Sequence, residues 1–405
     1  MLSSTFPYPP TKGGTHNRTF NLITPIARNH EVTLITQCPP EVAESAITAL
    51  AEYVDELVVF PRPQAAISNN KISKLQRFAN FIWYGTPPNV LYLYTEEIQK
   101  WVDEAVQAGK FEAITCEHSV NEVYIRPQWR RHLTTVLDIH SSVYRTCKNQ
   151  LETGTSDNQW RDRLFLPFLE RYERNTVKKF SKVVVTTDED LQQVKEFDST
   201  TEASIVANGV DLETFPYRSQ DPGGYNIVFV GGLDYFVNID AAVFFAREVF
   251  PQLQSQYPDA TLTLVGSKPA PEVKLLSQEN SAITVTGRVP SIAEYLHQAT
   301  VAVAPLRTGF GMKIKTLEYM AAGTPVVGSD RGLEGIKVDT DNVPLRAIRA
   351  NTADEFVNAV SQLFENPQLR AKLSRNGREM IESEYTWSEL AKKYEKIIMA
   401  DSLRV

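Results

Sequence analysis

The chain is organised around the stretch Arg307-Thr-Gly-Phe-Gly-Met-Lys-Ile-Lys-Thr-Leu-Glu-Tyr-Met-Ala-Ala-Gly-Thr-Pro-Val-Val-Gly328. A loop with two glycines leads into a run of good helix formers, roughly residues 313–322. Gly323 is placed to end this helix in the left-handed conformation. Residues 324–328 then predict a short buried strand behind a proline. The order of loop, helix and strand is typical of an α/β fold.

The start of this predicted helix is a candidate phosphate site. Unpaired N–H groups and the helix dipole favour an anion there, and Lys313 and Lys315 add two full positive charges. Lys315 and Glu318 are three residues apart and therefore share a helix face, where the carboxylate could accept the ribose hydroxyls of a nucleotide. An ordinary solvated Lys–Glu pair explains the same spacing equally well.

The composition is that of an ordinary soluble protein. The 405 residues predict two or three domains, and 42% hydrophobic with 22% charged residues argue against a disordered or fibrous chain. The net charge of −7 gives no support to nucleic-acid binding. No apolar run approaches the roughly 18 residues of a membrane-spanning helix. The first residues also lack the basic region and the apolar core of a signal peptide.

The cysteines, Cys38, Cys116 and Cys147, form neither a metal-binding spacing nor a disulfide framework. We therefore expect a cytoplasmic protein that needs no metal and no cofactor.

Strands and helices alternate along the first half of the chain. Buried strands are predicted at residues 31–36, 56–60, 111–116, 134–139 and 182–187. This alternation predicts a doubly wound parallel sheet. Only Met1 and Leu2 precede the Pro/Gly-rich loop of residues 3–14, whereas a buried strand normally has about five residues. Either the first strand is very short, or the chain begins several residues into it.

A polar, proline-containing linker at residues 211–224 separates this half from a second one of the same kind. Its strands are predicted at residues 226–230, 261–265, 282–286 and 300–304, with a helix at about residues 239–255 after the first strand. The opening stretch and helices at 352–364, 367–384 and 388–400 follow. We therefore expect an α/β protein with two Rossmann-like doubly wound domains, residues 1–210 and 225–384, facing each other across a cleft. Such a cleft is the natural ligand site. Residues 385–405 form a final helix.

A looser segment at residues 61–88 combines basic and aromatic side chains, namely Lys71, Lys74 and Arg77 with Phe78, Phe81, Ile82, Trp83 and Tyr84. This amphipathic pattern could contact a membrane surface or the acyl chain of an acceptor. A helix packed on its own domain is the alternative reading.

Several phosphate-binding and catalytic motifs are absent from the sequence. There is no Gly-x4-Gly-Lys-Ser/Thr loop, no Gly-x-Gly-x-x-Gly after a first strand and no Gly-x-Ser-x-Gly elbow. These absences argue against an NTPase, a dehydrogenase and an α/β-hydrolase. What remains is the loop before residue 313, polar strand ends at Glu117-His118 and His140, and a Gly13-Gly14 loop before a predicted helix. A hydrogen-bonded structural histidine and a plain turn are the alternatives for His140 and Gly13-Gly14.

The chain resembles the glycosyltransferases of the GT-B fold, specifically family 4, the group 1 retaining enzymes. The resemblance covers nearly the whole length and is carried by Phe6-Pro-Tyr-Pro-Pro10 with Gly13-Gly14, Leu137-Asp-Ile-His140, Asn208-Gly-Val-Asp211, Phe229-Val-Gly231, Thr286-Gly-Arg-Val-Pro290 and residues 307–335. The last of these is the most specific. The branch that looks most similar assembles bacterial exopolysaccharides and cell-envelope glycans.

The resemblance implies that the second domain holds a nucleotide-sugar donor. Glu318 looks like the carboxylate that binds the ribose hydroxyls. Lys313, Lys315 and the N–H groups around Gly311 and Met312 look like the diphosphate site. Arg288 and Val289 lie where the family's loop meets the base.

In the first domain, the resemblance implies that His140 is the catalytic histidine beside the transferred sugar. Gly13 and Gly14 would reach the donor's phosphate from this domain, and Glu117 and His118 would face the acceptor. The final helix, with Trp387, would cross back onto the first domain.

Two departures from the family pattern concern charge. The family usually has two glutamates separated by seven residues, but counting back eight from Glu318 gives Phe310, and alignment on the glycines gives Thr308. The Arg and Lys that usually follow the first strand of the second domain are absent, since Gly232 and Val237 or Asn238 occupy that region. Our hypothesis is that Lys313 and Lys315 have taken over their role.

These observations predict a glycosyltransferase that moves a sugar from a nucleoside diphosphate sugar to a glycan, lipid-linked or small-molecule hydroxyl. Retention of the anomeric configuration is implied by the resemblance alone. Fixed dipoles and lysines at the helix start would stabilise the leaving group without a metal. Two alternatives stay open, a nucleotide-sugar epimerase of the same fold and a non-catalytic partner subunit that binds nucleotide. We expect a cytoplasmic location, with peripheral contact at the inner face of the membrane as a further hypothesis.

Overall fold

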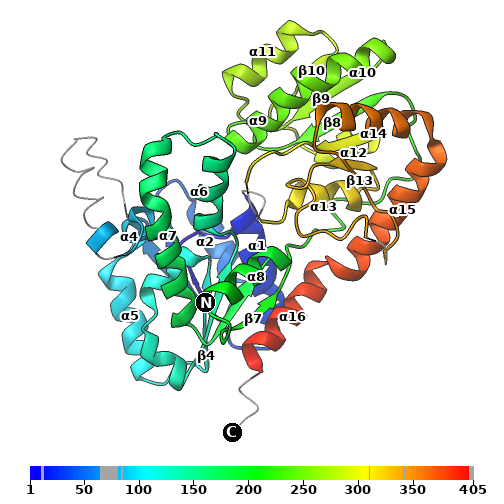
Figure 1. Cartoon of the computed structure of the whole chain (residues 1–405). Coiled ribbons are helices and arrows are strands. Elements are labelled where there is room, and N and C mark those ends of the chain that lie inside the picture. Colours follow the sequence, from blue (N-terminus) through cyan, green and yellow to red (C-terminus); the bar gives the residue numbers. More distant parts are fainter. Residues whose placement is uncertain (11–12, 64–80, 84, 310, 341–342, 401–405) are drawn as a thin grey trace. The chain divides into compact units, whose positions relative to one another are not determined.

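The computed structural model describes most of the chain (Figure 1), namely residues 1–10, 13–63, 81–83, 85–309, 311–340 and 343–400. It divides into two compact units. Unit 1 comprises Met1–Ala207 with Trp387–Val405, and unit 2 comprises Asn208–Thr386. Within the described ranges, no helix is both long enough and apolar enough to span a membrane.

Unit 1 is built on a seven-stranded parallel sheet of order β3-β2-β1-β4-β5-β6-β7. The strands are β1 (Leu2–Ser3), β2 (Thr33–Cys38), β3 (Glu56–Pro61), β4 (Ala113–Glu117), β5 (Thr134–Ile139), β6 (Lys182–Val185) and β7 (Glu202–Ile205). The helices are α1 (Gly14–Ile26), α2 (Glu44–Ala51), α4 (Pro88–Leu93), α5 (Glu96–Gln107), α6 (Val143–Glu152), α7 (Gln159–Lys179), α8 (Asp188–Phe197) and α16 (Trp387–Met399), with 3₁₀ turns η2 (Ser119–Tyr124) and η3 (Pro127–Arg131).

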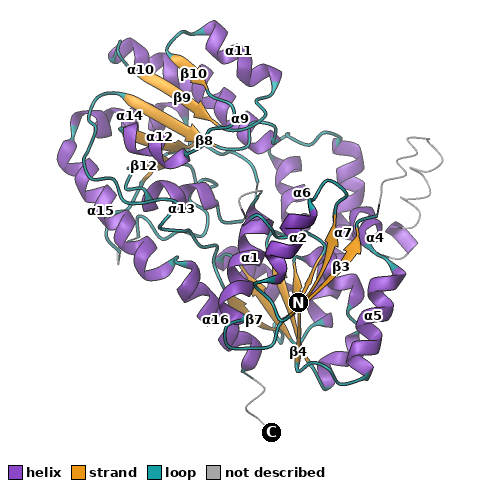
Figure 2. Ribbon diagram, turned by 180° about the vertical axis from the view of Figure 1, so that it is seen from behind, coloured by secondary structure: helices purple, strands orange, loops and turns teal. Residues whose placement is uncertain are grey.

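Helices cover both faces of the unit 1 sheet (Figure 2), as a parallel sheet requires. The side of α5 and α7 holds an apolar cluster in which Val102 and Val177 pack with strand residues such as Leu137 and Val183. The last helix, α16, packs against α1 (red and blue in Figure 1). The Lys182 ammonium also donates to the carbonyl of Ile397 at 2.9 Å, so the end of the chain is fastened to the strands.

Unit 2 carries a six-stranded parallel sheet of order β10-β9-β8-β11-β12-β13. Its strands are β8 (Asn226–Val230), β9 (Thr261–Val265), β10 (Ile283–Val285), β11 (Val301–Ala304), β12 (Val326–Gly328) and β13 (Ile348–Arg349). Its helices are α9 (Phe236–Phe244), α10 (Phe250–Gln256), α11 (Pro271–Glu279), α12 (Ile292–Gln298), α13 (Ile314–Ala321), α14 (Ala353–Glu365) and α15 (Pro367–Glu384).

The predicted fold class, two doubly wound parallel α/β domains, is confirmed. One local difference lies at residues 239–255, predicted as a single helix. Here α9 and α10 are joined by a π-helical turn at Phe245–Val249, because Pro251 in the first turn of α10 has no N–H to donate. Most of the basic–aromatic segment at residues 61–88 lies outside the described residues. The expected cleft between the two halves stays a prediction.

Candidate functional site

In unit 2, the loop before α13 is shaped by Gly309 and Gly311, which both have φ of +84°. This left-handed conformation favours glycine. Lys313 follows at the N-cap of α13, and its ammonium donates to the carbonyl oxygen of Gly311 at 2.5 Å and lies 3.8 Å from a Glu334 oxygen. The Lys313 ammonium is therefore held both by its own loop and by Glu334, which follows β12. Met312 is buried between these residues. Phe310, which stands where a sugar-binding glutamate is expected, lies outside the described residues.

Lys315 is held in the first turn of α13 at the end of strand β8. Its Nζ donates to Asn238 Oδ1 at 2.5 Å and lies 4.5 Å from the centre of the Phe229 ring. A Cβ atom at Gly231 would come within 2.8 Å of both Lys315 Nζ and Asn238 Cγ, so a larger residue there would displace one of these two side chains. Burial, assisted by repulsion from Lys313, lowers the pKa of Lys315 to about 7.

Glu318 lies one turn further along the same helix face. Burial raises the pKa of its carboxyl to about 7, and attraction to Lys315 only partly opposes this shift. No hydrogen bond to the Glu318 carboxyl is found among the described residues. A partly buried acid with free acceptor capacity beside a lysine is a chemically reasonable partner for a pair of ribose hydroxyls next to a phosphate.

Arg288 and Val289 follow β10 in a loop that is entered at Gly287. The N–H of Gly266 donates to the Gly287 carbonyl at 3.2 Å, which ties this loop to the end of β9. The Arg288 side chain is exposed, and no ion pair of it occurs within the described ranges. The proposed contact of these two residues with a nucleotide base stays a prediction.

In unit 1, the end of β5 carries a buried ion pair. Arg18, from α1, donates from Nε to Asp138 Oδ2 at 2.7 Å and from Nη2 to Asp138 Oδ1 at 2.8 Å. Burial alone would raise the pKa of Asp138, but Arg18 and then His140 outweigh it and hold the pKa well below its usual range. His140 Nε2 lies 3.3 Å from Asp138 Oδ2, and the ring is largely buried. The imidazole is therefore placed beside a carboxylate that is ionised.

His118 lies beside His140, with ring centres 5.0 Å apart. It has φ of +77°, an uncommon conformation for a residue with a side chain, and its N–H donates to the Asp138 carbonyl at 3.0 Å. Burial and then the neighbouring His140 lower the pKa of His118 to about 3. His118 is therefore a neutral imidazole at physiological pH.

Glu117 is buried under these histidines, with a relative exposure of 1%. One carboxyl oxygen accepts from the Tyr394 hydroxyl of α16 at 2.9 Å and from Thr115 at 3.1 Å. Burial, followed by repulsion from Asp138, raises the pKa of Glu117. Its carboxyl therefore belongs to the interior of unit 1 and does not lie on a surface that an acceptor could reach directly.

Gly13 and Gly14 stand where α1 begins, Gly13 as the N-cap and Gly14 as the first helical residue. The Gly13 carbonyl accepts from the N–H of Asn17 at 2.9 Å. A Cβ atom at Gly13 would meet only His16, at 3.5 Å. The expected approach of this loop to a donor phosphate stays a prediction.

The side chains of Glu117, Asp138 and His140 bring potential metal-ligand atoms within 4.8 Å of one another. Arg18 already donates to both oxygens of Asp138 and supplies the positive charge at this place. The raised pKa of Glu117 also favours its neutral form. This electrostatic setting disfavours an additional cation.

Three residues of these clusters were not singled out as site residues by sequence reasoning. Asp138 lies inside the Leu137-Asp-Ile-His140 motif, but the sequence does not show that its carboxylate pairs with Arg18 beside His140. Asn238 was noted only as a replacement for a family lysine. For Arg18 the sequence shows only a charged residue on an apolar helix face, because its partner Asp138 is 120 positions away.

Residues 224–366, which run from just before β8 to just after α14 and include α13, match the family model of the glycosyl transferases group 1. The candidate glycosyltransferase YtcC of Bacillus subtilis is 22% identical over 75% of this chain and 76% of its own. A phosphatidyl-myo-inositol mannosyltransferase of Mycolicibacterium smegmatis is 29% identical over 46% of this chain and 49% of its own length. The match within unit 2 and the named relatives together identify the chain as a glycosyltransferase.

Solved structures of similar fold cover nearly all of this glycosyltransferase. Sucrose-phosphate synthase from Thermosynechococcus elongatus has a TM-score of 0.68 at 16% identity and covers 97% of this chain, with 94% of its own chain matched. HepE of Anabaena, solved with UDP-glucose, has a TM-score of 0.64 at 13% identity, with 100% and 98% of the two chains matched. WaaG, a glycosyltransferase of lipopolysaccharide biosynthesis, has a TM-score of 0.62 at 14% identity, with 95% and 96% matched. The fold of this glycosyltransferase is GT-B.

Proposed function

We propose that this glycosyltransferase moves a sugar from a nucleoside diphosphate sugar to a hydroxyl group of a glycan or lipid-linked acceptor. The observation that carries the proposal is the pairing of Lys315 with Glu318 at the start of α13, inside the region that matches the family model. The lysine suits the diphosphate, and the carboxyl suits the ribose hydroxyls. An ordinary surface pair would lie in solvent, whereas Lys315 is held under Asn238 against Phe229.

The reaction breaks the bond between the anomeric carbon and a phosphate oxygen, so negative charge grows on the leaving diphosphate. The first N–H groups of α13 and the Lys315 ammonium are fixed before the reaction starts, and groups of this kind stabilise developing charge without reorganising. This supply of charge supports the proposal that no metal ion is needed. Retention at the anomeric carbon, and membership of family 4, are proposed from the resemblance.

For unit 1 we propose that His140 contacts the transferred sugar and that Gly13 and Gly14 approach the donor phosphate. The support for His140 is its place at the carboxyl end of β5, beside an ionised Asp138. Its neighbour His118 is neutral, so this second imidazole adds no positive charge beside His140.

The substrates are proposed from the relatives. The mycobacterial relatives are named for mannosyl transfer to phosphatidyl-myo-inositol, and the HepE structure holds UDP-glucose. We propose a UDP-hexose or GDP-hexose donor and an acceptor from exopolysaccharide or cell-envelope glycan assembly. The reaction would then take place in the cytoplasm.

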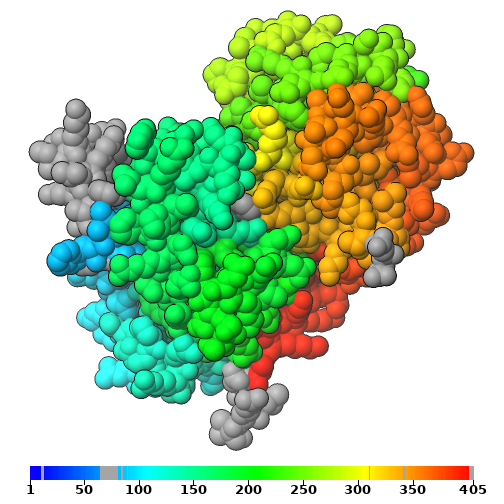
Figure 3. Space-filling model, in the orientation of Figure 1, coloured from blue at the N-terminus to red at the C-terminus, as the bar shows by residue number. Residues whose placement is uncertain are grey.

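Peripheral contact with a membrane is proposed from a group of exposed side chains on unit 1. Trp160 and Leu164, one turn apart on α7, are 79% and 57% exposed, and α6 and α7 form a continuous part of the surface in Figure 3. Trp83 is 83% exposed, and nearby Phe81 packs on Phe165 and Phe168 of the same helix. Exposed tryptophans beside basic residues such as Arg163 are suited to a membrane interface.

Calorimetry of UDP and GDP binding, followed by an assay of UDP- and GDP-hexoses with a lipid-linked acceptor, tests the proposal. We expect one nucleotide to bind in preference to the other and sugar transfer only when the acceptor is present. Conversion of the nucleotide sugar without acceptor would instead identify an epimerase. Nucleotide binding without any turnover across the panel would identify a non-catalytic subunit.

A further inference from the structure

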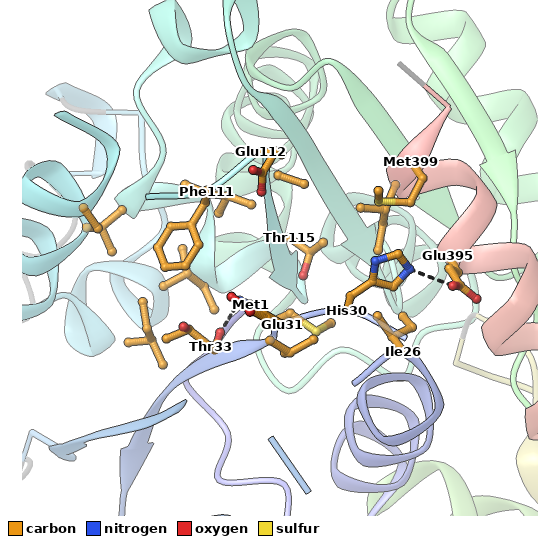
Figure 4. Close-up of a pocket in the computed structure, with 18 of the residues that line it drawn as sticks. Met1, Ile26, His30, Glu31, Thr33, Phe111, Glu112, Thr115, Glu395 and Met399 are labelled. Carbon is orange, nitrogen blue, oxygen red and sulfur yellow. Dashed lines mark hydrogen bonds and ion pairs between the residues drawn. The ribbon is translucent and has the colours of Figure 1, made fainter. Parts of the chain in front are cut away.

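The two units differ in the charge that they offer to an anionic ligand. Unit 1 contains a cavity of about 420 Å³ (Figure 4), which is lined by apolar side chains such as Phe111 and by the acids Glu31, Glu112 and Glu395. These carboxyl groups disfavour the entry of a phosphate. In unit 2, by contrast, cationic side chains gather beside the start of α13, and one of them is Arg331.

Arg331 lies in the turn that follows β12, at the carboxyl end of the unit 2 sheet. Strands β11 and β12 are parallel neighbours, so the loop from β11 to α13 and the turn after β12 leave the sheet at the same edge. The Ser329 hydroxyl donates to the carbonyl of Leu306 in that loop at 2.5 Å. Thr316, in the first turn of α13, donates to the carbonyl of Gly332 at 2.7 Å. The turn that carries Arg331 is therefore fastened beside the start of α13.

Gly332 allows this turn to pack closely on β11. A Cβ atom at Gly332 would lie 2.2 Å from the carbonyl oxygen of Ala304, so a larger residue would push the turn away from the strand. The N–H of Gly332 also donates to Ser329 Oγ at 3.0 Å. Arg331 is thus carried by backbone whose position is closely defined.

Glu334 connects Arg331 with Lys313. Its side chain is only 2% exposed, and Oε2 lies 3.5 Å from Arg331 Nη1 and 3.8 Å from Lys313 Nζ. A buried carboxylate needs compensating charge, and these two cations contribute it. Both distances exceed the roughly 2.7–2.9 Å of a charge-assisted hydrogen bond, so the contacts to Oε2 are ion pairs without a short bond. One carboxylate therefore holds two cations at the same end of α13.

The Arg331 guanidinium is suited to a phosphate. Its side chain is 32% exposed, whereas the Lys313 side chain is 12% exposed. A guanidinium carries five N–H donors in a planar fork, more than the contact with Glu334 uses, and this fork matches phosphate oxygens. The adjacent carboxylate, Asp330, is paired with Arg349 at 2.6 Å.

We propose that Arg331 is a further donor-binding residue, whose guanidinium contacts the diphosphate, and that Glu334 positions Arg331 and Lys313 for this contact. This role rests on the proposed function, because it adds a residue to the donor site at the start of α13. Lys315 packs on Phe229 of β8, and β11 lies between β8 and β12 in the sheet. Arg331 and Lys315 therefore supply positive charge on the two sides of the loop that leads from β11 to α13.

Calorimetry with uridine and UDP tests the contact with the diphosphate, and guanosine and GDP replace them if the wild-type chain prefers GDP. We expect Arg331→Gln to weaken UDP binding by about 10- to 100-fold, the range for hydrogen bonds to charged groups. The affinity for uridine, measured by competition, should stay unchanged, since uridine has no phosphate. Arg331→Lys should recover part of the loss, because it keeps the charge without the fork.

Arg375→Gln, on the exposed side of α15, is the matched control and should leave both affinities unchanged. Unchanged UDP binding in Arg331→Gln, or equal losses for UDP and uridine, would overturn the role of Arg331. A wild-type chain that binds neither UDP nor GDP would instead contradict the proposed function itself.

Glu334→Gln tests the positioning role, because it removes the charge and keeps the shape of the side chain. We expect weaker UDP binding with unchanged uridine binding, since both cations lose the group that orients them, and partial recovery in Glu334→Asp. Removing a carboxylate that only repels the diphosphate would have the opposite effect. Equal or tighter UDP binding in Glu334→Gln would therefore overturn this part of the proposal.

Discussion

Arg18 and Asp138 form a buried, bidentate ion pair that joins α1 to the end of β5, with N–O distances of 2.7 and 2.8 Å. The remaining donors of the same guanidinium reach the carbonyl oxygens of Ala207 and Val206, at 2.8 and 2.9 Å. One side chain thus connects the carboxylate beside His140 with the last residues of unit 1 before the chain enters unit 2. Bidentate geometry of this kind is specific to arginine.

Removing one member of this pair should destabilise unit 1 strongly. We expect Arg18→Met to lower the free energy of unfolding by about 3–5 kcal/mol, because it leaves the Asp138 charge buried without a partner. The double variant Arg18→Met/Asp138→Leu should recover much of this loss in urea-induced unfolding. A double variant that is less stable than the single one would contradict this account.

His140→Ala should fold normally and lose most of its transferase activity. General acid–base and hydrogen-bonding groups at a reacting centre typically contribute about 10²–10⁴-fold to the rate, so we expect a fall in kcat of that order. Affinity for the nucleoside diphosphate, measured by calorimetry, should change little, since Lys315 and Glu318 are intact. His132→Ala, on the η3 side of unit 1, serves as the control. Near-normal turnover of His140→Ala would refute the catalytic role.

Donor binding should depend on pH through Lys315. Its pKa is lowered to about 7, so the cationic form that attracts a diphosphate declines as pH rises through neutrality. We therefore expect the affinity for a nucleoside diphosphate to fall from pH 7 towards pH 9. Bound diphosphate favours the charged lysine and moves this decline to higher pH.

Lys315→Met should weaken donor binding, flatten this pH profile and lower kcat by roughly 10²-fold. Lys274→Met, on the exposed face of α11, is the matched control and should leave both measurements unchanged. Unchanged turnover and donor affinity in Lys315→Met would show that this lysine has not taken over the charge role of the absent family residues.

Glu117 should make unit 1 less stable as pH rises. Its pKa is raised by burial, so above pH 4.5 the folded form keeps a proton that the unfolded chain has released. The free energy of unfolding therefore decreases with pH until the folded carboxyl also ionises. We expect Glu117→Gln, which stays neutral, to remove this slope in urea titrations at several pH values. An identical slope in the variant would contradict the assignment.

The membrane contact should depend on the exposed tryptophans of unit 1. We expect the wild-type chain to co-sediment with vesicles that contain anionic lipid, and Trp83→Ser/Trp160→Ser to lose most of this binding. The double variant should retain nucleotide affinity, since both residues belong to unit 1 and lie outside the donor site of unit 2. Equal sedimentation of both proteins would remove the support for a peripheral location.

Local signals in the sequence were sufficient for the helix at the donor site. It was predicted at residues 313–322 and is α13, Ile314–Ala321, followed by Gly323 with φ of +79°. Helix propensity, a glycine after the last turn and a proline before the next strand act over a few residues, so they are readable without knowledge of the fold. The shared face of Lys315 and Glu318 follows from helix geometry in the same way.

The electrostatic state of those residues could not be read from the sequence. Lys315 donates to Asn238, which is 77 positions away in the chain, and Arg18 donates to Asp138, which is 120 positions away. Elements that are distant in sequence also exclude solvent from the buried charged groups. Helix α16, for example, places the Tyr394 hydroxyl against the Glu117 carboxyl. Two parallel α/β sheets, and a lysine and a glutamate on one helix face, could be predicted from the sequence because those features arise from short-range periodicity. Which charges are paired and which pKa values are shifted depends on the folded structure, because burial and long-range contacts set the free energy of each charge.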